Sequence, residues 1–255
     1  MAYCIMHKVK KILITGATSG VGFALAKRLL KEGHEVWAIG RNEVALEELA
    51  QRGAETFRVD LAQPASFDLL CTEIETPDVV IFSAGVGTFS YAYEATDREI
   101  IETMQVNVMS AMQLTRRLLP RMMEKNNGQL IYIGSQAGKV ATPKASVYAA
   151  SKHALIGYTN ALRLELKDFH IAVTAIHPGP IDTPFLDSAD QTGNYRQSVD
   201  KHLLSIQEVV EAVIQTMYKP VREVNLPRYM GLSSKLYGLM PTIVEKLGKR
   251  FFFKK

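Results

Sequence analysis

A tyrosine and a lysine that could exchange a proton with a substrate stand four residues apart, as Tyr148 and Lys152. In a helix this spacing places both side chains on one face. A free tyrosine has a pKa near ~10 and is a poor base at neutral pH, but a neighbouring ammonium lowers that pKa by stabilising the phenolate. Tyr148 could then take a proton from an alcohol or give one to a carbonyl oxygen. A structural helix can carry the same pair as a packed tyrosine beside a surface lysine, so other residues must support the interpretation.

A glycine-rich turn lies near the start of the chain, with Gly16, Gly20 and Gly22 between a predicted strand and a predicted helix. Glycine permits a tight turn with positive φ and lets backbone N–H groups approach a phosphate. The N-terminus of the following helix points its positive end at the same anion. A glycine-rich loop without a ligand is the alternative. A second strand follows about 20 residues on, which favours a dinucleotide site.

The residues after the second predicted strand indicate which dinucleotide binds. A carboxylate there would accept from the ribose 2′-hydroxyl of NAD. The chain has Gly40, Arg41 and Asn42 instead, and an arginine can hold a 2′-phosphate by charge-assisted hydrogen bonds. We expect no acid close enough to repel that phosphate, so the sequence favours NADP(H), with NAD(H) possible. Arg41 as an ordinary solvated arginine at a helix start is the alternative.

Alternating strands and helices must position these residues. Short apolar runs predict strands over residues 11–16, 35–40, 55–60, 78–85, 128–135 and 171–179. Helical patterns cover 21–31, 43–51, a segment from about 64, 96–125 with a bend at Pro120, and 147–169. Continuously apolar strands are buried on both faces, so the alternation predicts a Rossmann-like, doubly wound parallel α/β sheet with right-handed crossovers, in a single domain.

Ligands of such sheets bind at the carboxyl ends of the strands. The polar and glycine-rich positions gather there, and Ser135 at the end of the fifth predicted strand could hydrogen-bond the oxygen that Tyr148 serves. The following loop, residues 184–205, carries Phe185, Leu186 and Tyr195 and predicts a lid over a partly apolar pocket, with a disordered connector as the alternative.

Bulk properties fit a soluble enzyme. The 255 residues are 47% hydrophobic and 22% charged, with a net charge of +4 and no basic stripe for nucleic acid. We expect a cytoplasmic location, because the two cysteines are far apart, no apolar run is long enough to span a bilayer, and the first residues do not resemble a secretory leader. No ligand set has metal spacing. We expect one domain over residues 1–230 and a basic amphipathic tail over 231–255, whose residues 232–255 could touch a membrane, a second subunit or the pocket.

Taken together, these motifs resemble the compact members of the short-chain dehydrogenase/reductase family. The resemblance covers residues 10–183 and continues more weakly to about 229. It implies that Tyr148 is the acid/base, that Ser135 orients the substrate oxygen, and that Lys152 lowers the tyrosine pKa and binds the nicotinamide ribose. Asn107 resembles the helix asparagine whose backbone carbonyl holds a water in a proton relay to that lysine. Two departures are Ser83, where the family has asparagine, and Ser19, where an arginine can precede Gly20.

The resemblance also extends the cofactor site and gives an assembly. Asp60 and Leu61 would meet the adenine, and residues 178–183 would surround the nicotinamide. The predicted cofactor-binding residues are Gly16, Thr18, Ser19, Gly20, Val21, Gly22, Arg41, Asp60, Leu61, Ala84, Gly85, Tyr148, Lys152, Pro178, Gly179, Ile181 and Thr183. Helices 97–125 and 147–169 would pair subunits into a homodimer or homotetramer.

The resulting prediction is an oxidoreductase that moves a hydride between NADP(H) and a small carbonyl or alcohol substrate. Its four predicted catalytic residues are Asn107, Ser135, Tyr148 and Lys152. Two other interpretations stay open. One is a non-catalytic NADP(H)-binding sensor, and the other is a peripheral membrane reductase of lipid-like ketones.

Overall fold

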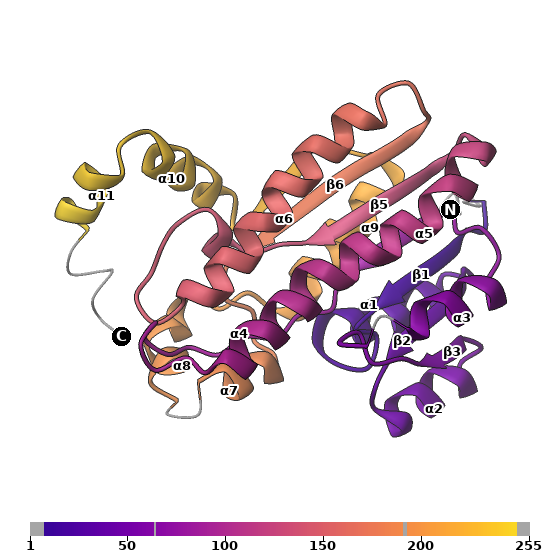
Figure 1. Ribbon diagram of the computed structural model, residues 1–255, viewed down its shortest axis with the longest axis horizontal. Helices are drawn as coiled ribbons and strands as arrows, with labels where there is room; N and C mark the ends of the chain where they lie inside the picture. Colours follow the sequence, from indigo (N-terminus) through magenta and orange to yellow (C-terminus); the bar gives the residue numbers. More distant parts are fainter. Residues whose placement is uncertain (1–7, 64, 191–192, 249–255) are drawn as a thin grey trace, which may run out of the picture.

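Seven parallel strands form one sheet at the centre of the molecule in the computed structural model, which describes residues 8–63, 65–190 and 193–248 (Figure 1). The strands are β1 (Lys11–Thr15), β2 (Glu35–Gly40), β3 (Glu55–Arg58), β4 (Val79–Phe82), β5 (Gly128–Ile133), β6 (Ile171–Pro178) and β7 (Glu223–Leu226). Their order across the sheet is β3-β2-β1-β4-β5-β6-β7. The order reverses direction between β1 and β4, as in doubly wound folds.

Helices cover both faces of the sheet. They are α1 (Gly20–Lys31), α2 (Glu43–Gln51), α3 (Ser66–Glu73), α4 (Asp97–Met104), α5 (Ser110–Lys125), α6 (Ser146–Glu165), α7 (Pro184–Ala189), α8 (Asn194–Val199), α9 (Ile206–Tyr218), α10 (Arg228–Leu239) and α11 (Pro241–Leu247). One buried cluster holds side chains of α1, α2 and α9, and the other holds those of α3, α5 and α6. The predicted α/β architecture is confirmed.

The two apolar clusters explain the continuous apolar strands. All four residues of β4 are buried, and so are the last five residues of β2 and of β5. Alternate side chains of a strand point to opposite faces. Ile12 and Ile14 of β1 therefore pack in the cluster of α1 and α9, while Leu13 packs in the other. Because helices cover both faces of a parallel sheet, its strands do not alternate between apolar and polar residues.

The long helical stretch after β4 differs from the predicted single helix with a bend at Pro120. Thr96 and Glu99 form a capping box at the start of α4. A π-helical turn, η1 (Gln105–Met109), then separates α4 from α5, and α5 continues through Pro120 to Lys125. Single π turns often occur at functional sites, and this one carries the predicted site residue Asn107.

The carboxyl-terminal third holds elements that the sequence patterns did not predict. The parallel edge strand β7 and helix α9 follow the lid, and the lid itself contains α7, α8 and the 3₁₀ turn η3 (Asp200–His202). The predicted tail, residues 231–255, contributes most of α10 and all of α11, and these two helices project from the body of the molecule (Figure 1). Residues 249–255 of that tail lie outside the described residues. Among the described helices, none is both long and apolar enough to cross a bilayer.

Candidate active site

A cavity of about 980 Å³ opens at the carboxyl ends of the strands. Its wall includes the glycine turn after β1, the ends of β2 and β3, the loops after β4, β5 and β6, and the first turns of α6. Every residue predicted for the site lines it except Gly22 and Asn107. The sheet therefore brings residues from six strand ends into one crevice, as the rule for doubly wound folds requires.

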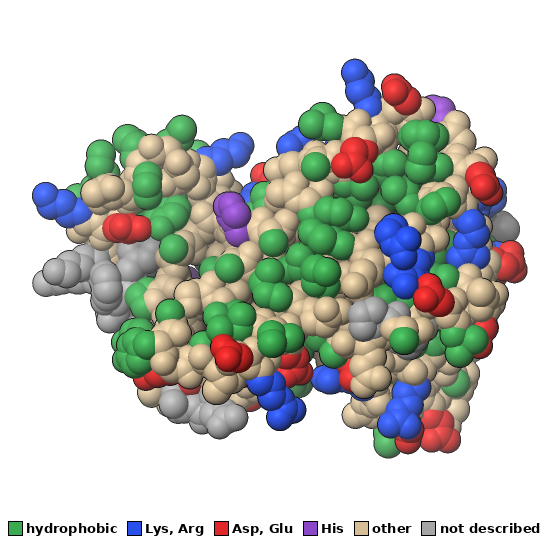
Figure 2. Space-filling model, viewed as in Figure 1, with side chains coloured by type: hydrophobic (Ala, Val, Ile, Leu, Met, Phe, Trp, Pro, Cys, Tyr) green, Lys and Arg blue, Asp and Glu red, His purple; other side chains and the backbone are tan. Residues whose placement is uncertain are grey.

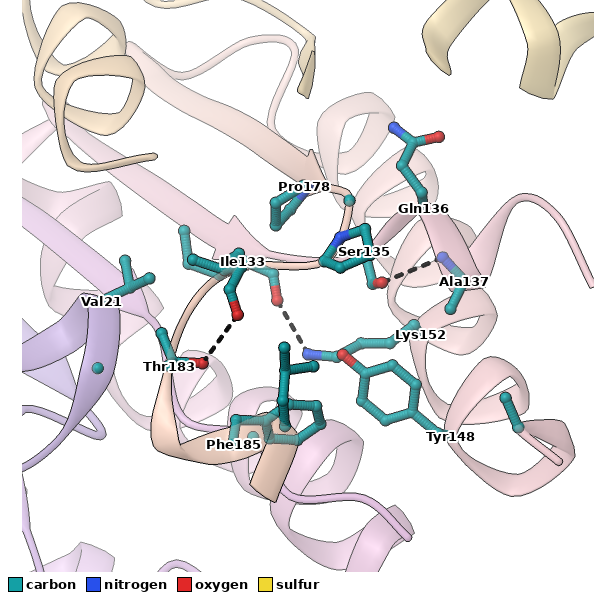
Figure 3. Close-up of a pocket in the computed structure, with 18 of the residues that line it drawn as sticks. Val21, Ile133, Ser135, Gln136, Ala137, Tyr148, Lys152, Pro178, Thr183 and Phe185 are labelled. Carbon is teal, nitrogen blue, oxygen red and sulfur yellow. Dashed lines mark hydrogen bonds between the residues drawn. The ribbon is translucent and has the colours of Figure 1, made fainter. Parts of the chain in front are cut away.

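Ser135, Tyr148 and Lys152 meet on one side of this cavity (Figure 3). Ser135 follows β5, where its Oγ accepts a hydrogen bond from the N–H of Ala137 at 3.0 Å. Tyr148 and Lys152 lie one turn apart on α6, and the lysine Nζ is 5.7 Å from the centre of the tyrosine ring. The same Nζ donates to the carbonyl of Ile133 at 3.0 Å. The predicted helix spacing thus places both groups on the cavity wall.

Burial controls the protonation of these two groups. Desolvation raises the pKa of the half-buried Tyr148 hydroxyl above its usual value of 10.0, and a hydrogen bond with Ser135 acts in the opposite direction. Desolvation lowers the pKa of Lys152 to about 8. The sequence led us to expect a lowered tyrosine pKa. The structure differs, because desolvation of the phenol is the largest effect on its pKa and outweighs the hydrogen bond with Ser135.

Asn107 lies behind the cavity wall. Its Oδ1 accepts from the N–H of Val86 at 2.8 Å, and its Nδ2 donates to the Val86 carbonyl at 2.8 Å and to Ser151 Oγ at 2.9 Å. The side chain is 2% exposed. These bonds fix the loop after β4 against α6 at Ser151, the residue that precedes Lys152. A role for the Asn107 backbone carbonyl in a water relay stays a prediction.

The glycine turn has the shape that a phosphate cradle requires. Gly16 and Gly20 have φ values of +67° and +49°. A Cβ on Gly16 would lie 2.7 Å from Ala84 Cα, and one on Gly22 would lie 2.3 Å from the Gly16 carbonyl oxygen. Larger residues are therefore excluded, and Gly22 acts by packing rather than by lining the cavity.

Helix α1 begins at this turn with its first N–H groups available to an anion. Ser19 is the N-cap, and its side chain makes no capping hydrogen bond. Such a helix start combines unpaired donors with the positive end of the helix dipole. Thr18, Ser19, Gly20 and Val21 all line the cavity. The residues present fit the diphosphate of a dinucleotide.

The predicted absence of an acid beside Arg41 is wrong. Asp60 Oδ1 lies 4.0 Å from Arg41 Nη1. The two residues follow neighbouring strands, because Gly40 of β2 pairs with Arg58 of β3. The carboxyl ends of these two strands therefore bring Arg41 and Asp60 to the same edge of the sheet. Arg41, Arg58, Asp60 and Gln63 line a second, smaller cavity of about 370 Å³. A phosphate bound there would lie near both the Arg41 guanidinium and the Asp60 carboxylate.

The remaining predicted residues complete the wall. Ala84 and Gly85 follow β4, and a Cβ on Gly85 would lie 3.4 Å from Lys152 Nζ. Pro178 ends β6, and Gly179, Ile181 and Thr183 lie in the segment that follows. Thr183 is buried next to the glycine turn, where its Cγ2 would lie 3.4 Å from a Cβ on Gly20. Among the described residues, no group of histidine, cysteine and acidic side chains could hold a metal ion.

Several wall residues were not predicted as site residues. They include Phe89 and Val140 in loops, Gln136 after Ser135, and Met230, Tyr237 and Val244 on α10 and α11. Gln136 donates to the His177 carbonyl at 2.8 Å and to Asn225 Oδ1 at 2.9 Å, which ties the loop after β5 to β6 and β7. Gln136 could have been predicted as a wall residue from its position next to Ser135. The spacing of Met230 and Tyr237, two helical turns apart, was the signal for α10.

Comparisons with known proteins agree with this geometry. The family description "short chain dehydrogenase" matches residues 10–194. The chain is 35% identical over 188 residues to the Escherichia coli K12 protein "Uncharacterized oxidoreductase YbbO", covering 72% of this chain and 70% of that one. It is 31% identical over 266 residues to the rat "Dehydrogenase/reductase SDR family member 7B", covering 95% and 79%.

A solved structure shows the same fold. The short-chain dehydrogenase from Sphingobium yanoikuyae, in complex with NADPH, superposes with a TM-score of 0.79 at 25% identity, over 92% of this chain and 96% of that one. The family match covers well over half of the chain, and the crevice carries the residues that the resemblance requires. This chain belongs to the short-chain dehydrogenase/reductase family of oxidoreductases.

Proposed function

We propose that the protein is an NADP(H)-dependent oxidoreductase that interconverts a carbonyl compound and an alcohol. The observation that carries this proposal is the convergence of Ser135, Tyr148 and Lys152 on a cavity that also contains a phosphate-fitting glycine turn. When bound, a nicotinamide dinucleotide supplies or accepts the hydride. The residues of the chain bind and orient the reactants and move the proton.

Burial raises the pKa of Tyr148, which favours the protonated phenol. A protonated phenol on the cavity wall suits proton donation to a carbonyl oxygen, which is the direction of reduction. The Ser135 hydroxyl, which shares a hydrogen bond with that phenol, holds the same oxygen. Lys152 places a positive charge one helical turn away, and this charge favours the phenolate once the proton has left.

The preference for NADP(H) rests on Arg41. Its guanidinium is 61% exposed at the cavity edge, where it can take a phosphate in place of its long contact with Asp60. The Sphingobium yanoikuyae relative was solved with NADPH, which supports a nicotinamide dinucleotide as the cofactor. The nearby carboxylate lowers the expected selectivity, since it repels a phosphate at Arg41.

Replacement of Tyr148 by phenylalanine tests the proton chemistry. Tyr148→Phe removes the acidic hydroxyl and keeps the ring, so we expect NADPH binding within about twofold of wild type and a loss of turnover of at least about 100-fold. Reduced nicotinamide absorbance measures turnover across ketones and aldehydes, and fluorescence titration measures binding. Tyr158→Phe is the matched control, since Tyr158 lies on the same helix outside the cavity wall.

Two outcomes would contradict the proposal. Turnover by Tyr148→Phe above a tenth of the wild-type rate would remove Tyr148 as the acid. Tight NADPH binding by the wild-type protein without oxidation of the cofactor by any carbonyl compound would favour the NADP(H)-binding sensor instead.

A further inference from the structure

The cavity extends beyond Tyr148 toward the two carboxyl-terminal helices. This distal arm is lined by Val140, Thr142, Met230, Ser233, Tyr237 and Val244. Met230 begins the arm beside the segment after β6, because a Cβ on Gly179 would lie 3.0 Å from its sulfur. Tyr237 donates to Glu245 Oε1 at 2.7 Å, which holds α11 against α10. A dinucleotide on the glycine turn and Arg41 would leave the distal arm to the substrate.

The side chains around Tyr148 are aromatic. Its ring centre lies 5.4 Å from that of Phe185 and 5.9 Å from that of Phe89, and Phe89 packs on Tyr195 at 4.5 Å. Gly87 completes this cluster, since a Cβ there would lie 2.7 Å from Tyr148 Cδ2. The reacting carbon therefore meets an apolar surface on the side of the lid.

Charge on the cavity wall limits the substrate further. Arg41 and Lys152 are the only lysine or arginine residues among the described lining residues. Arg41 lies at the far end with the glycine turn, and Lys152 already donates to the Ile133 carbonyl. Near the lid the ionisable lining groups include Asp200 and His202 rather than a fixed cation. A carboxylate or phosphate on the substrate would lose water without gaining a partner, which is strongly unfavourable.

We propose that the substrate is a neutral carbonyl compound or alcohol with an extended apolar chain, whose reacting carbon lies at Tyr148 and whose chain lies in the distal arm. This inference rests on the proposed function and adds the substrate class. Short hydroxy acids and keto acids are excluded, since they would bring a charge to the aromatic cluster and leave the distal arm empty. A buried methylene improves binding by up to about fourfold, so the chain supplies the specificity.

A ketone series tests the substrate class. With NADPH, we expect kcat/KM to rise at least about tenfold from butan-2-one to octan-2-one, as the chain enters the distal arm. We expect 11-oxododecanoate to be at least about tenfold poorer than dodecan-2-one, because the described residues that line the distal arm offer its carboxylate no cation. Equal kcat/KM values for butan-2-one and octan-2-one would overturn the inference, and so would equal kcat/KM values for 11-oxododecanoate and dodecan-2-one.

Two substitutions on α11 locate the chain. Val244 is half-buried and lines the distal arm, whereas Leu247 is 84% exposed on the same helix. Val244→Asp should lower kcat/KM for dodecan-2-one at least about tenfold, a larger loss than for butan-2-one, while Leu247→Asp leaves both unchanged. Val244→Lys should reverse the preference and favour 11-oxododecanoate.

The outcomes also separate this inference from the proposed function. Absence of turnover with every ketone and aldehyde contradicts the proposed function. Turnover that Val244→Asp and Leu247→Asp change equally, or that Val244→Lys does not shift toward 11-oxododecanoate, contradicts the placement of the chain and leaves the oxidoreductase activity intact.

Discussion

Lys152 is a buried cation that weakens the fold in which it sits. The side chain is 4% exposed, and desolvation lowers its pKa to about 8 from 10.5. The described structure gives its ammonium one hydrogen bond, to the Ile133 carbonyl. Such a group costs stability while charged, because the unfolded chain solvates it fully. Retention of a costly charge on the wall of a cavity is typical of functional sites.

The sign of this effect gives a first prediction. Since the folded pKa is the lower one, the unfolded state binds more protons between about pH 8 and pH 10.5, and stability rises with pH across that window. We expect the Lys152→Met variant to lack this rise. The unfolding free energy of wild type relative to the variant should increase by about 2 kcal/mol from pH 7 to pH 9.5, as measured by urea denaturation. A pH-independent difference would mean that Lys152 is not desolvated.

Arg41 and Asp60 make opposite contributions to cofactor choice. Arg41→Ala should raise the Kd of NADPH about 10- to 100-fold and leave that of NADH within about threefold, because the lost bonds are charge-assisted bonds to the 2′-phosphate. Asp60→Asn should strengthen NADPH binding by removing repulsion. Arg52→Ala is the control, since Arg52 pairs with Glu48 at 3.1 Å on α2. Equal weakening of NADPH and NADH by Arg41→Ala would contradict phosphate recognition.

At the scale of elements, the sequence predicted what periodicity and motifs can carry. The first six strands and helices α1, α2 and α6 have long apolar patterns, and their positions followed. Strand β7 has four half-buried residues at the sheet edge, so it lacks a continuous apolar run. Helices α7 and α8 have six residues each, which is too short for helical periodicity to show.

Contacts between segments that are distant in the sequence could not be predicted. The pairing of Arg41 with Asp60 depends on the register of β2 and β3, which neither segment reveals alone. The raised pKa of Tyr148 depends first on its burial and then on Ser135 and Tyr195, which come from other segments of the chain. The site residues could be predicted because its glycines and its Tyr–Lys pair lie in short motifs. Their ion pairs and pKa shifts depend on the three-dimensional fold and could not be predicted.

The outer faces of α10 and α11 give a prediction about location. Leu232, Leu239 and Leu247 of these two helices are at least 75% exposed. Residues 228–255 include seven lysines and arginines but one glutamate. Apolar side chains among basic residues suit an anionic lipid surface, where each basic residue contributes about 1 kcal/mol. We predict binding to phosphatidylserine vesicles that high salt weakens.

Vesicle sedimentation measures this binding, with phosphatidylcholine vesicles as the neutral comparison. The double variant Leu232→Glu and Leu239→Glu should lose this binding, whereas Leu69→Glu should not, because Leu69 is an exposed leucine on α3, away from α10 and α11. Wild-type protein that stays in the supernatant with both lipids would end the membrane hypothesis. Retained binding by the double variant would place the contact elsewhere.

At the scale of the whole molecule, one broad surface remains uncovered. Helices α4 and α6 pack side by side, and apolar side chains gather over them and α5 in the middle of the view (Figure 2). Exposed apolar residues of this helical layer include Ile101 on α4, Met109 in η1 and Leu164 on α6. The family resemblance implied pairing of subunits through these helices. A symmetric dimer would bury the same face of both copies.

Gly157 offers a clean test of that assembly. It lies on the exposed surface of α6, and a Cβ there would meet nothing within 4 Å. Gly157→Arg should therefore not disturb the single chain, and its helix propensity should raise stability by up to about 1 kcal/mol. In a dimer through α6 the added side chain would collide with the partner, so we expect a dimeric wild type and a monomeric variant by light scattering. Gly238→Arg, a glycine on α10 with the same open surroundings, should remain dimeric. A dimer that survives Gly157→Arg would place the interface away from α6, and a monomeric wild type would contradict the assembly itself.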